Sequence, residues 1–199
     1  MNKLYRVLRA IVRPICLLIF RIKYIGLENL PDGGGYIICS NHTSMMDIPI
    51  IAIKVKPQVH YMAKEELFKN KISAWFFNQM GAFAVKRGSG GVAALKQAEE
   101  LVKSGNVMGI FPEGTRNFEG APKKAKSGIS VVVANSNATV VPVSIYHEGK
   151  LKLFDKITVR FGEPISKEQL GMTDSSRTEL RRVSTLLMDK ITEQWEKGH

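Results

Sequence analysis

Short apolar runs rich in β-branched and aromatic residues recur along the chain from residue 36 onward, and helical patterns separate several of them. These runs predict strands at residues 36–39, 59–62, 82–85, 107–111, 139–145 and 157–161, and the clearest helices at residues 92–103 and 175–195. The strands are apolar throughout, not only at every second position, which is typical of a sheet covered on both faces. The sequence therefore predicts an α/β fold, a single domain with a mostly parallel central sheet flanked by helices.

The first 27 residues carry six basic side chains and no acidic one. Wound as a helix at about 100° per residue, they place most of the bases on one arc and apolar residues from Leu4 to Leu18 on the opposite arc. The longest uncharged run, residues 14–20, has seven residues, whereas a membrane-spanning helix needs about 20. We therefore expect an amphipathic helix in the headgroup layer of an anionic membrane, which makes the protein monotopic or peripheral. The alternatives are a helix packed on its own core and a secretory signal, although Arg21 interrupts the signal pattern.

The clearest hinge lies at residues 30–35, which contain Pro31 and three glycines. We expect residues 1–30 to form the membrane-binding helix with its hinge, and residues 31–199 to form one catalytic domain with a single core. Cys16 and Cys39 lack metal-ligand or redox spacing, so we expect reduced thiols in a cytoplasmic protein.

The chain has 29 Lys and Arg against 18 Asp and Glu, a formal charge of +11. Such a charge predicts a negatively charged partner, which is nucleic acid, anionic lipid or a phosphorylated substrate. Neither an aromatic stacking patch nor a helix-turn-helix pattern is present, and the N-terminal bases lie opposite an apolar face. We therefore expect a lipid surface and no nucleic acid.

His42 and Asp47 lie five residues apart, directly after the predicted strand 36–39. In a loop that turns into a helix, Asp47 can accept a hydrogen bond from His42 Nδ1 and leave Nε2 free as a general base. The alternative is structural, because Ser44 and Asp47 also match a helix capping box. A further alternative makes Cys39 an acyl-accepting nucleophile, although a buried strand position favours packing.

The segment FPEGTR at residues 111–116 ends another predicted strand. Gly114 lets backbone amides approach an anion, and the Arg116 guanidinium matches phosphate oxygens. Glu113 either orients Arg116 or binds a substrate hydroxyl, and the alternative for the whole segment is a solvated turn.

Four blocks in this order carry a family resemblance: NHTSMMD at residues 41–47, the strand that leads into Lys86 and Arg87, FPEGTR, and VVPVSI at residues 140–145, with FGEPI following at 161–165. They resemble the motif blocks of the glycerolipid acyltransferases, most closely the bacterial 1-acylglycerol-3-phosphate acyltransferases. The resemblance implies that residues 31–199 are an acyltransferase domain.

By this resemblance, His42 deprotonates the acceptor hydroxyl and Asp47 orients it, while Arg87, Glu113, Gly114 and Arg116 bind the acceptor phosphate. Lys64, in a stretch that also resembles the family, is a further phosphate contact or else a solvent-facing lysine. The implied reaction moves a fatty acyl group from acyl carrier protein or CoA to lysophosphatidic acid, giving phosphatidic acid without an acyl-enzyme, a metal or a cofactor. Other acceptors, glycerol 3-phosphate or a lyso-aminolipid, fit the same chemistry.

The implied location is the cytoplasmic face of the cell membrane. Lys123, Lys124 and Lys126 follow FPEGTR and either meet the acidic face of acyl carrier protein or are solvated.

Overall fold

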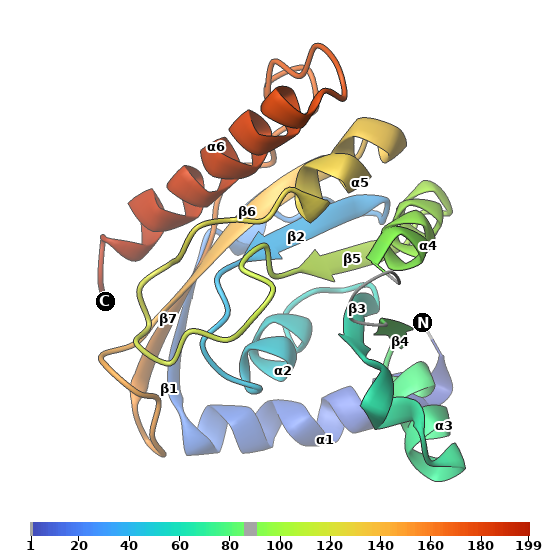
Figure 1. The fold of residues 1–199 in the computed structure, drawn as a ribbon. Coiled ribbons are helices and arrows are strands. Elements are labelled where there is room, and N and C mark those ends of the chain that lie inside the picture. The colour runs from blue at the N-terminus through green and yellow to red at the C-terminus, as the bar shows by residue number, and fades with distance from the viewer. Residues whose placement is uncertain (1, 86–90) are drawn as a thin grey trace.

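The computed structural model describes residues 2–85 and 91–199 (Figure 1). Arg87 and its predicted phosphate contact therefore lie outside the described residues. The helices are α1 (Lys3–Ile19), α2 (Asp47–Ala52), α3 (Lys71–Gln79), α4 (Gly91–Lys103), α5 (Gly128–Ser136) and α6 (Arg177–Trp195), with short 3-10 helices η1 (Leu27–Asn29) and η2 (Glu65–Phe68). The strands are β1 (Arg21–Ile25), β2 (Tyr36–Ser40), β3 (Val59–Lys64), β4 (Ala82–Val85), β5 (Val107–Ile110), β6 (Thr139–Tyr146) and β7 (Lys156–Phe161).

The strands of the described chain form one seven-stranded sheet in the order β1-β7-β6-β2-β5-β3-β4. Neighbouring strands run parallel except β6 and β7, which are antiparallel. All five residues of the central strand β2 are buried, as expected of a strand covered on both faces. The predicted α/β fold with a mostly parallel sheet is confirmed.

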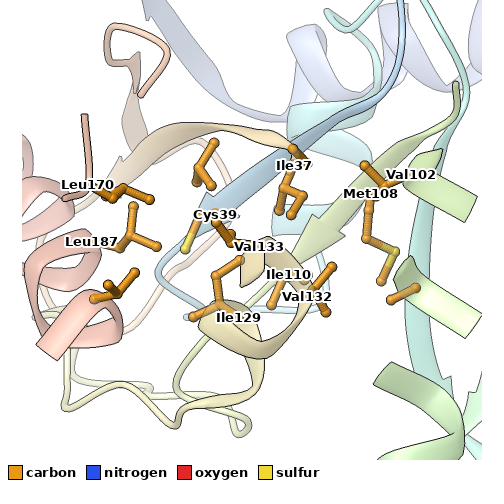
Figure 2. Close-up of a cluster of buried hydrophobic side chains, with 14 of the residues drawn as sticks. Ile37, Cys39, Val102, Met108, Ile110, Ile129, Val132, Val133, Leu170 and Leu187 are labelled. Atoms are coloured by element: carbon orange, nitrogen blue, oxygen red, sulfur yellow. The ribbon is translucent and has the colours of Figure 1, made fainter. Parts of the chain in front are cut away.

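Two apolar clusters fill the space on either side of the sheet. On one face, Ile37 and Cys39 of β2 pack with residues of α4, α5 and α6, as Figure 2 shows for part of this cluster. On the other face, Tyr36 and Ile38 pack with residues of α2 and with Phe20. Because successive side chains of a strand point to opposite faces, the apolar run of β2 contributes to both clusters.

Strand β1 corrects the prediction that the N-terminal helix includes Arg21 and Lys23. The helix ends at Ile19, and the next residues pair in parallel with β7, with Arg21 opposite Lys156. Along β1 the exposed Arg21 and Lys23 alternate with the half-buried Ile22 and Tyr24. This period of two belongs to an edge strand, so both bases leave the helix and join the rim of the sheet.

Helix α1 is amphipathic as predicted, but its apolar side chains divide between two surroundings. Tyr5 and Cys16, which lie beside the predicted apolar arc, are buried against the domain, whereas Val7, Ile11, Ile15 and Leu18 of that arc are exposed. The helix therefore packs on the core mainly beside the predicted arc, and most of the arc itself forms an exposed apolar stripe. Within the described residues, none of the helices combines the length and the hydropathy needed to cross a bilayer.

Candidate active site

Two loops meet at the carboxyl edge of the sheet. The loop with His42 follows β2, and the loop with Glu113 follows β5, which is the strand paired with β2 through Cys39 and Ile110. Parallel neighbours end at the same edge of the sheet, which is where α/β proteins place their sites. Topology therefore joins two motifs that lie about seventy residues apart in the sequence.

The Asp47 carboxylate is buried and holds the His42 ring. Its Oδ2 lies 2.8 Å from His42 Nδ1 and accepts the backbone N–H groups of Thr43 and Ser44 at 2.6 and 2.8 Å. Its Oδ1 accepts the Thr43 hydroxyl at 3.1 Å. The Ser44 N–H bond matches one half of the predicted capping box, but α2 begins at Asp47 with Met46 as its N-cap. The carboxylate therefore orders the turn before the helix and orients the histidine.

His42 has the geometry of a general base. An ionised carboxylate only accepts hydrogen bonds, so the proton of a neutral imidazole lies on Nδ1 and Nε2 carries a free lone pair. Within residues 2–85 and 91–199, the structure gives Nε2 no hydrogen bond. The ring is stacked on Phe111, with centroids 4.0 Å apart and planes at 15°, and the side chain is 14% exposed. The ring is thus fixed on one face while its reactive nitrogen stays accessible.

Glu113 fixes the backbone of the histidine. Its Oε1 accepts the His42 N–H at 3.0 Å, and the His42 carbonyl accepts the Asn117 N–H at 2.7 Å. The other oxygen of Glu113, Oε2, is buried and has no hydrogen-bond partner in the described structure. Burial raises the pKa of Glu113 above its usual value, and His42 and Lys123 only partly offset this rise. Of the two predicted roles, a contact to a substrate hydroxyl fits Oε2 better than orientation of Arg116.

Gly114 and two cations form the outer part of this loop. Gly114 has φ of +71°, a left-handed conformation that side chains disfavour, and its N–H closes a turn onto the Phe111 carbonyl at 3.0 Å. A Cβ atom at Gly114 would lie 2.9 Å from Lys126 Nζ, so this lysine covers the turn. The exposed Arg116 lies over the Phe118 ring at 5.5 Å. Lys126, whose role the sequence left open, thus lies beside Gly114.

Lys64 is the exposed last residue of β3, opposite Val85 of β4 in the strand register. Strand β3 is separated from β2 only by β5, which corresponds to roughly 10 Å across the sheet. Lys64 lies at the same edge of the sheet as His42, and its phosphate contact stays a prediction, as does that of Arg87.

Three residues that the sequence analysis did not single out support the site. The Asn41 side chain donates to the Ile145 carbonyl at 2.9 Å and accepts the Ile145 N–H at 2.8 Å, which locks the loop to β6. The buried His147 places Nε2 at 2.9 Å from the Thr43 hydroxyl, so Thr43 connects this histidine to Asp47. Asn41 and Thr43 belong to the first motif, whereas His147 follows β6 and carries no sequence signal.

Cys39 does not fit the role of a nucleophile. It is fully buried in the apolar cluster of Figure 2, and burial raises the pKa of its thiol far above the usual value. A thiol without water or a base beside it stays protonated and unreactive.

Known proteins are similar to this chain in both sequence and fold. A family model described as Acyltransferase matches residues 21–146. The 1-acyl-sn-glycerol-3-phosphate acyltransferase of Bacillus subtilis is 32% identical over 186 residues, covering 83% of this chain and 89% of that protein. The protein of the same name from Streptococcus pneumoniae is 28% identical over 182 residues, covering 86% and 67%.

Among solved structures, the 1-acyl-sn-glycerophosphate (LPA) acyltransferase PlsC from Thermotoga maritima is similar with a TM-score of 0.70 and 27% identity, covering 88% of this chain and 71% of that one. The fold and these sequence matches define an acyltransferase. The chain belongs to the acyltransferase family, as an enzyme of the 1-acyl-sn-glycerol-3-phosphate acyltransferase class.

Proposed function

We propose that the protein transfers a fatty acyl group from the thioester of acyl carrier protein or CoA to the free hydroxyl of lysophosphatidic acid, giving phosphatidic acid. The observation that carries this proposal is the 2.8 Å contact between His42 Nδ1 and a buried Asp47. The names of the relatives support lysophosphatidic acid as the acceptor.

In the proposed reaction, His42 Nε2 accepts the proton of the acceptor hydroxyl as the oxygen attacks the thioester carbonyl. The new C–O ester bond forms, the C–S bond breaks, and the protonated imidazole returns the proton to the departing thiolate. Asp47 stabilises the imidazolium between these two proton transfers, so neither an acyl-enzyme nor an external base is needed.

Arg116, Gly114 and Lys126 form the phosphate-binding part of the proposed site, to which we add Arg87 and Lys64 as predicted. A guanidinium gives phosphate two parallel hydrogen bonds, and the turn at Gly114, which has no side chain, brings the Lys126 ammonium group close to the backbone. The buried Oε2 of Glu113 provides an acceptor for a glycerol hydroxyl, which would complete its hydrogen bonding.

We place the enzyme at the cytoplasmic face of the cell membrane as a monotopic or peripheral protein, with α1 on an anionic lipid surface. The exposed apolar stripe of α1 and its basic residues support this location. Each Lys or Arg near an anionic surface contributes about 1 kcal/mol.

A panel of acceptors tests the proposal. Purified protein is incubated with a labelled acyl thioester and with lysophosphatidic acid, glycerol 3-phosphate or a lyso-aminolipid. We expect the largest kcat/KM with lysophosphatidic acid, and a larger loss for Arg116→Ala with this acceptor than with an acceptor that lacks phosphate. Equal turnover of a non-phosphorylated acceptor would contradict the phosphate site.

A further inference from the structure

Exposed apolar side chains flank both ends of α1. Beyond its C-terminal end, in the connection from β6 to β7, Leu153 and Phe154 are 68% and 64% exposed. At its N-terminal end, Ile72 and Trp75 of α3 are 78% and 56% exposed. Large apolar residues in such groups mark interaction surfaces more often than isolated ones do.

Hydrogen bonds tie both groups to α1. The Phe154 N–H donates to the Ile19 carbonyl at 2.8 Å, and the side-chain amide of Asn2, at the start of the helix, donates to the Gln79 carbonyl of α3 at 2.8 Å. In Figure 1, α1 runs along one side of the molecule, with α3 at one end and the connection between β6 and β7 at the other. A helix of 17 residues is about 25 Å long. The three elements therefore extend along one side of the protein.

Phe154 has a backbone conformation that is unfavourable for a phenylalanine. Its φ is +67°, the left-handed region, where residues other than Gly, Asn and Asp are rare. Besides its N–H contact to Ile19, its carbonyl accepts the Arg21 Nε–H at 3.1 Å, so both ends of this residue are fixed. A bulky apolar side chain that is both strained and exposed indicates a role outside the folded core.

The charges beside this end of α1 match an anionic lipid. A groove of about 570 Å³ is lined by the apolar Leu17 and Phe20 and by the cations Arg21, Lys23 and Lys156. An apolar floor with a cationic rim suits a lipid phosphate whose tail remains in the bilayer.

We propose that the segment with Leu153 and Phe154, together with α3, inserts into the surface of an anionic bilayer on either side of α1. The membrane surface of the enzyme then has three parts, and its ends hold α1 parallel to the bilayer. This inference rests on the membrane location proposed above and extends it to elements outside the N-terminal helix.

Flotation with vesicles of phosphatidylcholine and phosphatidylglycerol tests the inference. Two double variants remove the apolar side chains at each end: Leu153→Ser/Phe154→Asn and Ile72→Ser/Trp75→Ser. As a control, Val92→Ser removes a valine of α4 that is 78% exposed. Since full burial of one such side chain shifts an equilibrium roughly 10- to 100-fold, we expect each double variant to lower vesicle partitioning about tenfold and the control to leave it unchanged. Phe154→Asn should melt no lower than wild type, because Asn tolerates the left-handed region.

Wild-type partitioning by either double variant would overturn the three-part surface. If a double variant bound vesicles like wild type but turned over less substrate, the inference would also be wrong, and these residues would be assigned to binding of the acyl donor. Turnover of a water-soluble, short-chain lysophosphatidic acid needs no bilayer, so both double variants should retain this activity. If the wild-type protein itself did not turn over this substrate, the proposed function would be contradicted, not the membrane surface.

Discussion

Replacing Asp47 separates the two tasks of its carboxylate, which are to orient His42 and to stabilise its protonated form. In Asp47→Asn, the amide oxygen is expected at the Oδ2 position, because Oδ2 accepts two backbone N–H groups in addition to His42 Nδ1. The amide NH₂ then faces the Thr43 hydroxyl, which can rotate its proton toward His147 Nε2. The His42 tautomer therefore survives this substitution, and only the negative charge is lost.

The contacts also set the size of each effect. Loss of an adjacent opposite charge disfavours a protonated imidazole by roughly 10- to 1000-fold, so Asp47→Asn should lower kcat within that range. Asp47→Ala also removes the orientation of His42, which brings the loss toward the whole contribution of a general base, about 10² to 10⁴. It further leaves the buried N–H of Thr43 without an acceptor, at about 1–3 kcal/mol, and also removes the acceptor of the part-buried Ser44 N–H. Asp47→Ala should therefore be at least about tenfold slower than Asp47→Asn, and its Tm several degrees lower.

Steady-state rates with lysophosphatidic acid and a saturating acyl thioester, together with thermal melts of both variants, give these quantities. If a natively stable Asp47→Asn were as inactive as Asp47→Ala, the amide would be in the opposite orientation. The argument that the backbone N–H groups fix the carboxylate would then be wrong.

Three further predictions concern the surroundings of the site. Burial raises the pKa of Glu113, so in the native state this group holds its proton to higher pH than in the unfolded chain, and its contribution to stability falls as pH rises above about 4.3. In melts from pH 4 to pH 7, Glu113→Gln should therefore gain Tm relative to wild type as pH increases, and a constant difference would contradict the buried position. A methyl group at Gly109 would lie 2.1 Å from Tyr61 Cε1, so Gly109→Ala should lower the free energy of unfolding by about 1–3 kcal/mol. Chemical denaturation measures this loss, and an unchanged denaturation midpoint would contradict the close contact. Arg116→Ala should raise KM for lysophosphatidic acid about 10- to 100-fold, with a smaller change in kcat. Lys124→Ala removes a positive charge from another exposed residue as the matched control and should change KM little. Equal changes in KM for the two variants would argue for general electrostatic attraction over a specific phosphate contact.

The sequence predicted the elements whose pattern agrees with their environment in the fold. Strand β2 was predicted within one residue because its apolar run matches burial on both faces. Strand β1 was missed because Arg21 and Lys23 continue the basic pattern of α1, and only pairing with β7 makes them part of an edge strand. Helix α5 was also missed, since its three consecutive valines favour a strand and only packing of Val132 and Val133 in the core stabilises the helix.

At the site, the sequence predicted contacts within one motif more readily than contacts between distant segments. The five-residue spacing of His42 and Asp47 suffices for their hydrogen bond, because both lie in one loop. The contact of Glu113 with the His42 backbone depends on the pairing of β2 with β5, and that of His147 with Thr43 spans 104 residues. Such contacts depend on sheet topology, which local patterns do not encode.

The rate of His42→Ala with lysophosphatidic acid and an acyl thioester, beside wild type, tests the central claim most directly. His60→Ala, which removes a half-buried imidazole from β3 outside both site loops, is the matched control. The account predicts that His42→Ala loses about 10² to 10⁴ in kcat with a native melting curve, while His60→Ala retains activity. A folded His42→Ala protein that turns over lysophosphatidic acid at the wild-type rate would contradict the assignment of His42 as the general base.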